Sequence, residues 1–133
     1  MPEADVNYVA VVVAAILNMA AGAAWYSRPA FGDAWAKAVG KKMEDMGGAT
    51  TGYALTTIGS LIMAFVLAVF IDYTGAATFY QGAQTGLWAW LGFVLPTMGA
   101  NAVFEEKGRK LFAINAGYPL LALILMGGLL AVW

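Results

Sequence analysis

The sequence predicts an all-α membrane protein with four transmembrane helices and an amphipathic interfacial helix between the first and second of them. The 133-residue chain is 62% hydrophobic and 11% charged, whereas soluble domains carry about 25% charged residues, so lipid must face much of its surface. The apolar residues fall into four runs, each close to the roughly 20 residues that a helix needs to cross a bilayer. All seven Lys and Arg residues lie in two short stretches, 28–42 and 107–110. The length predicts a single domain over residues 1–133.

Each predicted transmembrane helix is an apolar run with no Asp, Glu, Lys or Arg in its interior. The four runs cover about residues 6–26, 52–71, 82–104 and 111–132. Only helices and closed β-barrels bond every backbone N–H and C=O group within lipid. A barrel strand would alternate apolar and polar residues, and runs such as VAVVVAAIL and LLALILMGGLLAVW do not alternate. The sequence therefore predicts four membrane-spanning helices.

The distribution of basic residues predicts which side of the membrane each loop faces. Loops that carry Lys and Arg next to a span are retained in the cytoplasm. The two basic stretches form the first and third loops, which share a side in a four-span protein, and the second loop and both chain ends have none. We therefore expect both termini outside, N-out and C-out. The residues before the first span include Glu3 and Asp5, whereas a cleavable signal peptide begins with a basic segment.

The first loop has the apolar spacing of a surface helix. Apolar residues recur there at steps of three or four: Phe31, Trp35, Val39, Met43 and Met46. This spacing predicts an amphipathic helix over about residues 31–46. Its lysines lie on other sides of the helix, where anionic lipid head groups would attract them. We interpret the segment as a helix on the inner leaflet, and the alternative is a docking surface for a soluble partner.

One face of the first span is predicted to contact protein rather than lipid. Asn7 and Asn18 are eleven residues apart, close to three helical turns, and Ala14, Ala15 and Gly22 fall on the same side. Small residues let helices approach closely, and an asparagine forms an interhelical hydrogen bond of about 1 kcal/mol. This face should therefore pack against the other spans.

Uncharged polar residues gather in the inner half of the predicted bundle. With the orientation above, every span brings at least one hydrogen-bonding side chain there, and together these form a candidate polar cluster: Asn18, Thr56, Ser60, Thr97, Asn101 and Asn115. One interpretation is a closed hydrogen-bond network that sets helix register, because unpaired amides in lipid are costly. The other is a small polar pocket open to the cytoplasm. Pro96 and Pro119 predict irregular backbone beside this region.

Two motifs are similar to those of a known family. The first is Trp25-Tyr26-Ser27 followed by Phe31 and Trp35. The second begins with the acidic pair at 105–106 and a basic cluster, continues as KLFAINAGY over residues 110–118, and is followed by Met126-Gly127 and a terminal Trp133. Together they resemble the bacterial membrane family DUF1761, a domain of unknown function, over nearly the whole chain. Arg28 and Pro29 replace the usual apolar residues after the first motif.

The resemblance implies a helical protein of the bacterial cytoplasmic (inner) membrane, and it implies no substrate. It directs attention to the inner interface, where the motif residues are expected: Trp25, Tyr26, Ser27, Phe31, Trp35, Glu105, Glu106 and Tyr118. We therefore expect the inner face, rather than the outer one, to contain the functional residues.

The composition excludes several kinds of chemistry. The chain has no Cys and no His, which removes thiolate nucleophiles, imidazole bases and the usual ligands of zinc, haem and iron–sulfur clusters. No cofactor and no metal site is predicted. No span contains a charge that could bind an ion or a proton in the membrane, which argues against an ion-coupled carrier. Nucleic-acid binding has no support, because topology already explains the basic stretches.

Three hypotheses remain for the function, and the first two of them are non-catalytic. The first is an oligomeric small-solute permease or pore whose copies associate through small-residue faces, such as Ala10, Ala14 and Gly22, or Gly82, Gly86 and Ala89. The second is an accessory or scaffolding subunit of a larger membrane complex. The expected partners are membrane lipid and either further copies of the chain or another membrane protein. An enzyme that uses carboxylates at the inner surface is the third and least supported hypothesis, since their spacing forms no known motif.

Overall fold

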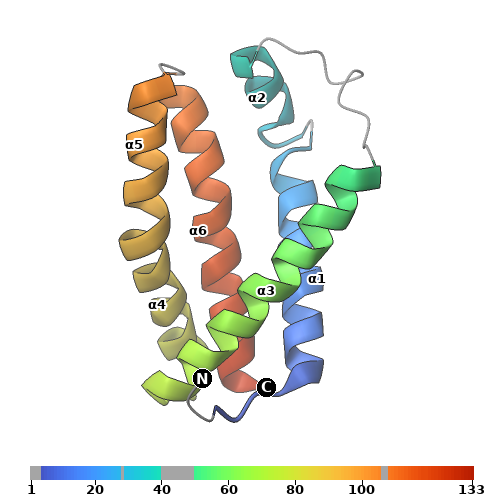
Figure 1. The fold of residues 1–133 in the computed structure, drawn as a ribbon, viewed down its shortest axis with the longest axis vertical. Coiled ribbons are helices and arrows are strands. Elements are labelled where there is room, and N and C mark those ends of the chain that lie inside the picture. Colours follow the sequence, from blue (N-terminus) through green and yellow to red (C-terminus); the bar gives the residue numbers. More distant parts are fainter. Residues whose placement is uncertain (1–3, 28, 40–49, 106–107) are drawn as a thin grey trace.

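The structure, a computed structural model, describes residues 4–27, 29–39, 50–105 and 108–133, and these residues contain no strand. Seven helical elements follow one another along the chain (Figure 1): α1 (Tyr8–Trp25), α2 (Gly32–Val39), α3 (Thr50–Thr74), α4 (Phe79–Ala89), η2 (Trp90–Val94), α5 (Leu95–Glu105) and α6 (Arg109–Val132).

The four predicted spans are confirmed as helices long and apolar enough to cross a membrane. They are Tyr8–Trp25, Gly52–Thr74, Phe79–Glu105 and Arg109–Val132, so no end differs from the sequence-based limit by more than about three residues, the usual uncertainty of helix ends. The third span combines α4, η2 and α5 into one continuous helical rod.

Local sequence explains where these helices begin and end. The Asn7 side chain accepts a hydrogen bond from a backbone N–H of the first turn of α1. At α4, Thr78 and Gln81 form a reciprocal capping box. Gly75 and Gly108 have φ angles of 71° and 84°, a left-handed conformation that favours glycine, and they stand directly after α3 and directly before α6.

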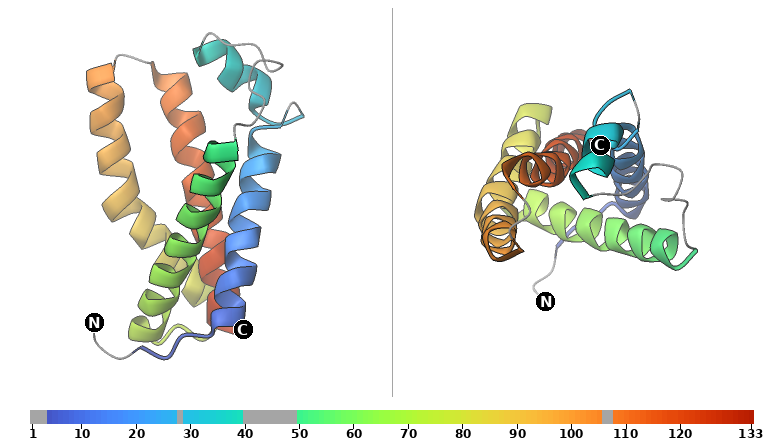
Figure 2. Two further views of the ribbon diagram at one scale, coloured as in Figure 1. Left: turned by 45° about the vertical axis from the view of Figure 1, so that its right-hand side comes forward. Right: turned by 90° about the horizontal axis from the view of Figure 1, so that it is seen from above.

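α6 is the central helix of the bundle. It packs against α1, α2, α3, α4, η2 and α5, and the view along the bundle places it between α1 and the third span (Figure 2). The hydrophobic core is formed by α1, α3 and α6, where apolar residues of all three are buried. In contrast, η2 and α5 have no buried residue, so the second half of the third span lies at the edge of the bundle.

Glycines bring α4 and α6 into backbone contact. A Cβ atom added to Gly82 would overlap the carbonyl oxygen of Gly127, and one added to Gly127 would overlap that of Gly82. Gly86 lies just as close to the Leu123 carbonyl. Such small-residue contacts are typical of membrane helices, since they allow close van der Waals packing. α4 is therefore held tightly, although the rod that continues from it is not.

The small-residue faces predicted for association between copies are instead used within one chain. Ala10 and Ala14 are buried in the core, and Gly82 and Gly86 are buried against α6. The prediction that these faces form an oligomer interface is wrong, because a face that lets one helix approach a partner serves equally well for a helix of the same chain.

The two prolines in the spans behave differently. Pro96 follows a π-helical turn, η2, in which the Leu95 N–H donates to the Trp90 carbonyl five residues earlier, so the irregular backbone predicted there is confirmed. Pro119 lies inside α6, which remains one helix over its whole length; there the prediction of irregular backbone is wrong.

The helix predicted in the first loop is present as α2, at the end of the bundle where α1 ends and α6 begins (Figure 1). The Phe31 ring lies 4.4 Å from the Trp25 ring, and the Trp35 ring lies 5.6 Å from that of Tyr26, measured between centroids. Residues 40–46 of the predicted helix lie outside the described residues. That α2 rests on the membrane surface stays a prediction.

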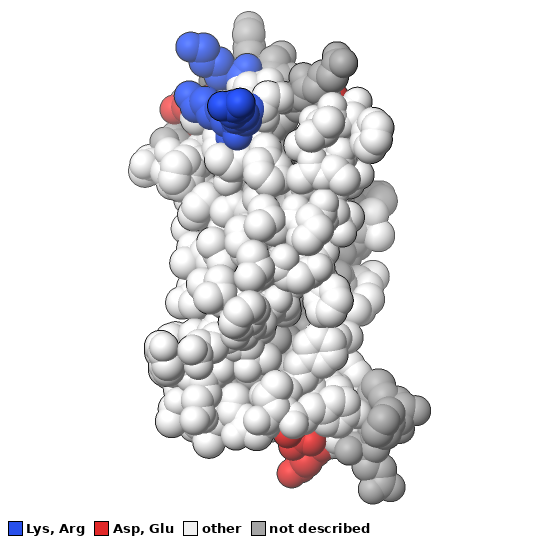
Figure 3. Space-filling view, turned by 90° about the vertical axis from the view of Figure 1, so that its left-hand side faces the viewer, with Lys and Arg blue, Asp and Glu red and all other residues white. Residues whose placement is uncertain are grey.

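The two ends of the bundle differ in charge (Figure 3). The basic end comprises α2 and the start of α6, with Lys37, Arg109 and Lys110. The acidic end comprises the start of α1, the end of α3 and the end of α6, with Asp5 and Asp72. Between the two ends the described surface is uncharged, as a bilayer core requires.

Candidate functional site

Three helix faces meet along the core and form a seam that runs from one end of the bundle toward the other. On each helix the inward residues are four apart, so they lie in a row along one face. We define the α1–α3–α6 seam by these residues: Ala10, Ala14 and Asn18 of α1; Ser60, Ala64 and Ala68 of α3; and Tyr118, Ala122, Met126 and Leu130 of α6.

A polar triad lies in the half of the seam nearer the basic end. The Asn18 Nδ2 atom donates to Ser60 Oγ at 2.7 Å, and the Tyr118 hydroxyl donates to Asn18 Oδ1 at 2.6 Å. Asn18 and Ser60 are both 2% exposed. Each helix of the seam contributes one member, so the triad fixes the register of all three helices, and its hydrogen bonds offset the cost of burying an amide in lipid.

An apolar layer closes the seam between the triad and the acidic end. It consists of Ala14, Ala64, Ala122 and Met126, each 0% exposed. Three of these side chains are single methyl groups, so Met126 supplies most of the volume. Along α1 and α3 the layer stands about 6 Å from the triad, since four residues of helix rise that far.

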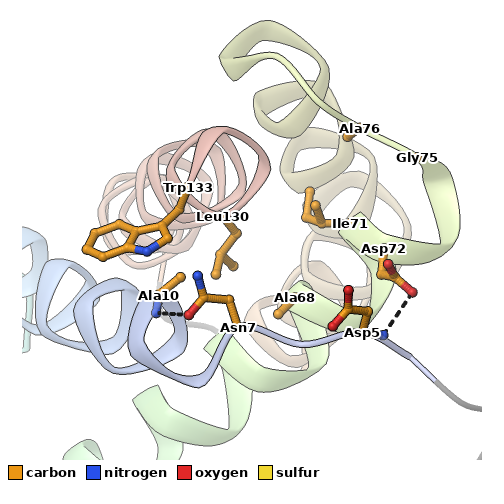
Figure 4. A pocket seen from close by; sticks show the side chains of 10 residues that line it. All are labelled: Asp5, Asn7, Ala10, Ala68, Ile71, Asp72, Gly75, Ala76, Leu130 and Trp133. Carbon is orange, nitrogen blue, oxygen red and sulfur yellow. Dashed lines mark hydrogen bonds between the residues drawn. The ribbon is translucent and has the colours of Figure 1, made fainter.

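A cavity of about 500 Å³ opens at the acidic end of the same seam (Figure 4). Its inner wall includes Ala10, Ala68 and Leu130, which belong to the three rows of the seam. The polar lining residues are Asp5 and Asn7 before α1, Asp72 near the end of α3, and Trp133 after α6, and Ile71, Gly75 and Ala76 complete the wall. The Asp5 N–H donates to the Asp72 carboxylate at 3.2 Å.

The two motifs similar to the family meet at the basic end of α1. The Trp25 indole N–H donates to the Ile114 carbonyl at 2.9 Å, and the Tyr26 hydroxyl donates to Asn115 Oδ1 at 3.0 Å. Trp25 also packs on Gly117, where an added Cβ would lie 2.7 Å from the indole ring. We name these contacts the aromatic clamp. It holds the end of α1 to α6, about one turn from the triad along α6 and about two turns from it along α1.

Two glycines make the clamp reciprocal. Gly117 of α6 accommodates the ring of Trp25 from α1, and Gly22 of α1 accommodates the ring of Tyr118 from α6, where an added Cβ would be 3.2 Å from the phenol. The Tyr26 and Tyr118 rings then meet edge to face, with centroids 5.8 Å apart. A larger residue at Gly117 would require the Trp25 ring to shift, and one at Gly22 would require the Tyr118 ring to move by a few tenths of an ångström.

A smaller recess lies between α5 and α6 at the basic end. Its volume is about 170 Å³, and its polar lining residues are Asn101, Glu105 and Asn115. Of the predicted polar cluster, Asn101 and Asn115 line this recess. The Asn115 side chain already accepts from Tyr26, so the recess borders the aromatic clamp.

The structure joins only some residues of the predicted cluster. Asn18 and Ser60 are hydrogen-bonded, and Asn101 and Asn115 line the same recess. Thr56 and Thr97 are exposed, and each hydroxyl donates to a carbonyl of its own helix, four residues earlier. A threonine can bond in this way without any partner helix, and for that reason its presence in a span predicts little about tertiary contacts.

The motif residues also divide into those near the interface and one that is deeper. Ser27 donates to the Ala24 carbonyl at 2.6 Å at the end of α1, and Glu105 ends α5. Tyr118 was predicted at the inner interface, but it lies nine residues into α6, roughly 13 Å along the helix. Its hydroxyl reaches still farther into the bundle, to Asn18. Glu106 lies outside the described residues.

Three features of the candidate site were not predicted from the sequence. They are the cavity at the acidic end, the place of the motif residue Met126 in the apolar layer, and Trp90, whose indole donates to the Ala116 carbonyl at 2.9 Å. The rows with a spacing of four on α3 and α6 were a signal for the first two. For Trp90 the sequence offered none, since its direction depends on the π-turn.

These features define an all-helical, multi-pass membrane protein whose hydrophobic core contains one buried polar triad. The chain belongs to the family described as "Protein of unknown function (DUF1761)", whose model matches residues 9–131. This confirms the resemblance drawn from the two motifs. No curated protein and no solved structure matches the chain.

Proposed function

We propose that this protein is a small-solute permease whose path follows the α1–α3–α6 seam. One observation supports this most: the cavity at the acidic end and the buried polar triad lie on the same three rows of residues. The inner wall of the cavity, at Ala10 and Ala68, is eight residues from Asn18 and Ser60, or about 12 Å along each helix. A solute in the cavity would therefore be one short apolar layer away from a set of hydrogen-bonding groups.

The layer between them is suited to open with little rearrangement. Ala14, Ala64 and Ala122 occupy little space, so the seam is closed chiefly by Met126. Methionine is unbranched and flexible, and a change of its rotamer displaces more volume than a branched side chain can. In this proposal the described conformation is closed, with its vestibule at the acidic end.

We also propose that the acidic end faces the outside and the basic end faces the cytoplasm of a bacterial inner membrane. The charge asymmetry supports this orientation. Because the chain has no Cys, single cysteines can be labelled without background. A membrane-impermeant maleimide applied to intact cells should label Ala77→Cys, in the α3–α4 connection, and should not label Lys110→Cys. Labelling of Lys110→Cys alone would contradict the orientation.

The permease proposal predicts opposite effects of two substitutions. Purified protein in liposomes should admit at least one of three labelled solutes, choline, glycerol or glutamate, faster than protein-free liposomes do. Asn18→Ala removes the centre of the triad and should lower that rate by about tenfold, which corresponds to about 1.4 kcal/mol of barrier. Met126→Ala removes the bulky side chain of the closing layer and should raise it.

The direction of these changes separates transport from misfolding. Loss of fold can lower the rate of solute entry. It cannot explain a rate that rises in Met126→Ala and falls again when Asn18→Ala is added in the double variant. Gln84→Ala, an exposed position in α4 outside the seam, is the control and should change nothing. Asn101→Ala and Asn115→Ala, at the recess, should impair flux more than Gln84→Ala. Equal rates in all variants would contradict the proposal.

A second candidate function, an accessory subunit of a larger membrane complex, is favoured by the third span. Its second half exposes large apolar side chains, among them Phe93, Val103 and Phe104 at 71%, 75% and 87%. These would face lipid in a solitary protein and a neighbouring helix in a complex. Absence of flux together with one stoichiometric partner in the purified particle would favour this function.

Catalysis is not part of the proposal. The described residues contain no group of three or more His, Cys, Asp or Glu side chains that could hold a metal ion, and the described carboxylates of the basic end, Asp33 and Glu105, belong to different helices. Association into a homo-oligomer stays a prediction, which the mass of the detergent-extracted particle tests. The path along the seam does not require it, because one chain supplies all three helices.

A further inference from the structure

The cavity at the acidic end has the size of a small-molecule site. Its volume of about 500 Å³ lies within the range of about 300–1,000 Å³ usual for ligand pockets. Five parts of the chain enclose it: the segment before α1, α1 itself, α3, the α3–α4 connection and the end of α6. Figure 4 shows that residues 65 positions or more apart in the sequence face one another across it, such as Asn7 and Asp72.

The wall of this cavity combines apolar and acidic side chains. Ala10, Ala68, Ile71 and Leu130 are buried apolar residues. The carboxylates of Asp5 and Asp72 stand together beside Ala68 and Ile71 and across the cavity from Ala10 and Leu130, and the Asp5 N–H donates a hydrogen bond to Asp72 Oδ2. That bond holds both residues at the cavity and leaves most oxygen lone pairs of the two carboxylates available to a ligand.

The surrounding charge favours cations and disfavours anions. No Lys or Arg occurs in residues 1–27, 43–106 or 111–133, and every segment that lines the cavity belongs to one of these stretches. None of the described residues that line the cavity is therefore Lys or Arg. A cavity with two carboxylates and no basic side chain among its described lining residues attracts a positive ligand and repels a negative one.

The lining fits an organic cation better than a metal ion. Calcium and magnesium prefer six or more oxygen ligands, and the described residues contain no group of three acidic side chains that could supply them. In contrast, Trp133 lines the cavity on the side away from the two aspartates, where its indole offers apolar surface to the alkyl part of an organic cation. The alkyl part of an organic cation would also remove apolar wall from water.

We propose that this cavity binds a small organic cation, with its ammonium group between Asp5 and Asp72 and its alkyl part against Ala68, Ile71 and Leu130. Small organic cations would then be the substrate class of the permease, and this assignment rests on the proposed function. The binding itself is measured at equilibrium and does not require transport.

Calorimetric titration of the full chain in an uncharged maltoside detergent tests the proposal. Two cationic probes, choline and butylammonium, represent quaternary and primary ammonium groups. The neutral isostere of choline, 3,3-dimethylbutan-1-ol, has the same shape without the charge. We expect saturable binding of at least one cation, and binding of the isostere at least about tenfold weaker, the order expected for loss of one partly screened charge contact.

Isosteric variants then assign the binding to the cavity. Asp5→Asn and Asp72→Asn should each raise the dissociation constant about tenfold, whereas Trp133→Leu, on the side of the cavity away from the ammonium group, should change it less. Asp33→Asn, which removes a carboxylate from α2 at the basic end, is the matched control and should leave it unchanged. Added salt should weaken the binding in the wild-type chain, because ions in the surrounding water screen the charge of the two carboxylates.

The outcomes distinguish this inference from the permease proposal. Failure of both cations to bind, equal binding of the neutral isostere, or full binding by the Asp5→Asn/Asp72→Asn double variant would overturn the organic-cation site. Cation binding with these variant effects but without any flux in liposomes would support the site and overturn the permease. If neither cation binds, but glycerol or glutamate enters the liposomes at a rate that Asp5→Asn and Asp72→Asn leave unchanged, the permease would be supported and the organic-cation site would be overturned.

Discussion

Replacement of Gly82 by alanine is expected to lower the free energy of unfolding by about 2 kcal/mol. The added Cβ would overlap the Gly127 carbonyl oxygen, which is backbone and cannot rotate away, so α4 must move off α6. Overpacking of this kind costs about 1–3 kcal/mol and occasionally more. Alanine also recovers up to about 1 kcal/mol of helix propensity, but the steric cost of a backbone overlap lies at the upper end of its range and exceeds that gain.

Gly59→Ala is the matched control for this effect. Gly59 lies in α3, and a Cβ added there meets no atom within 4 Å. The same substitution should therefore leave stability unchanged or raise it slightly. Denaturant unfolding followed by circular dichroism in one detergent compares the two variants. Equal stability of Gly82→Ala and Gly59→Ala would show that α4 and α6 do not pack through these glycines.

The consequence should extend along the third span. Because η2 and α5 have no buried residue, α4 is the part of this span that anchors it to α6. Displacement of α4 should also break the hydrogen bond from the Trp90 indole to the Ala116 carbonyl. We therefore expect hydrogen exchange to speed up across the whole third span in Gly82→Ala, rather than at the substituted turn alone.

Replacement of Trp25 by alanine is expected to cost a similar amount, about 2–3 kcal/mol. The substitution removes the hydrogen bond to the Ile114 carbonyl, the packing of the indole on Gly117 and the ring contact with Phe31. Truncation of a fully buried tryptophan costs about 3–5 kcal/mol, and Trp25 is only partly buried, which places the expected value below that range.

Two further variants divide this effect into its parts. Trp25→Phe keeps a ring but loses the N–H donor, so it should cost about 1 kcal/mol, the net contribution of one hydrogen bond. Trp88→Ala, at a side chain that is 66% exposed, is the control for removing a tryptophan from a span and should have little effect. If Trp25→Ala and Trp88→Ala were equally stable, the aromatic clamp would contribute nothing to the fold.

The clamp also predicts a change in α2. Trp25 contacts Phe31, the residue directly before α2, so its loss should increase the hydrogen exchange of the α2 backbone while the middle of α1 stays protected. The link between α1, α6 and α2 explains in physical terms why the two motif segments lie close in space although they are 89 residues apart in the sequence.

The candidate site shows how far sequence reasoning reaches. The prediction that one face of the first span meets protein is confirmed for Ala14, Ala15 and Asn18, which are buried. It is wrong for Asn7, which caps α1 from outside the helix and is exposed. That face was readable because polar and small residues recur along α1 at helical spacing. Thr56 and Ser60 share a face of α3 by the same rule, yet Ser60 is buried in the triad and Thr56 is exposed.

The difference between these two residues arises from the tilt of α3. Its half nearer the basic end projects beyond the bundle (Figure 2), where Tyr53 and Leu55 are more than half exposed as well. A helical period tells which residues share a face, but it does not tell at which point along its length that face meets a neighbour. This depends on crossing angles, which the packed side chains of two helices determine together.

The sequence by itself determined the four helices, their limits and the opposite charges of the two ends. Those properties follow from the length and composition of each segment alone, because lipid excludes charge and requires every backbone group to be bonded within its own helix. Only the tertiary structure decided that the Tyr118 hydroxyl meets Asn18, that glycines join α4 to α6, and that a cavity forms beside Asp5 and Asp72. Those contacts depend on how closely and at what tilt helices from distant parts of the chain approach one another, and no single segment contains that information.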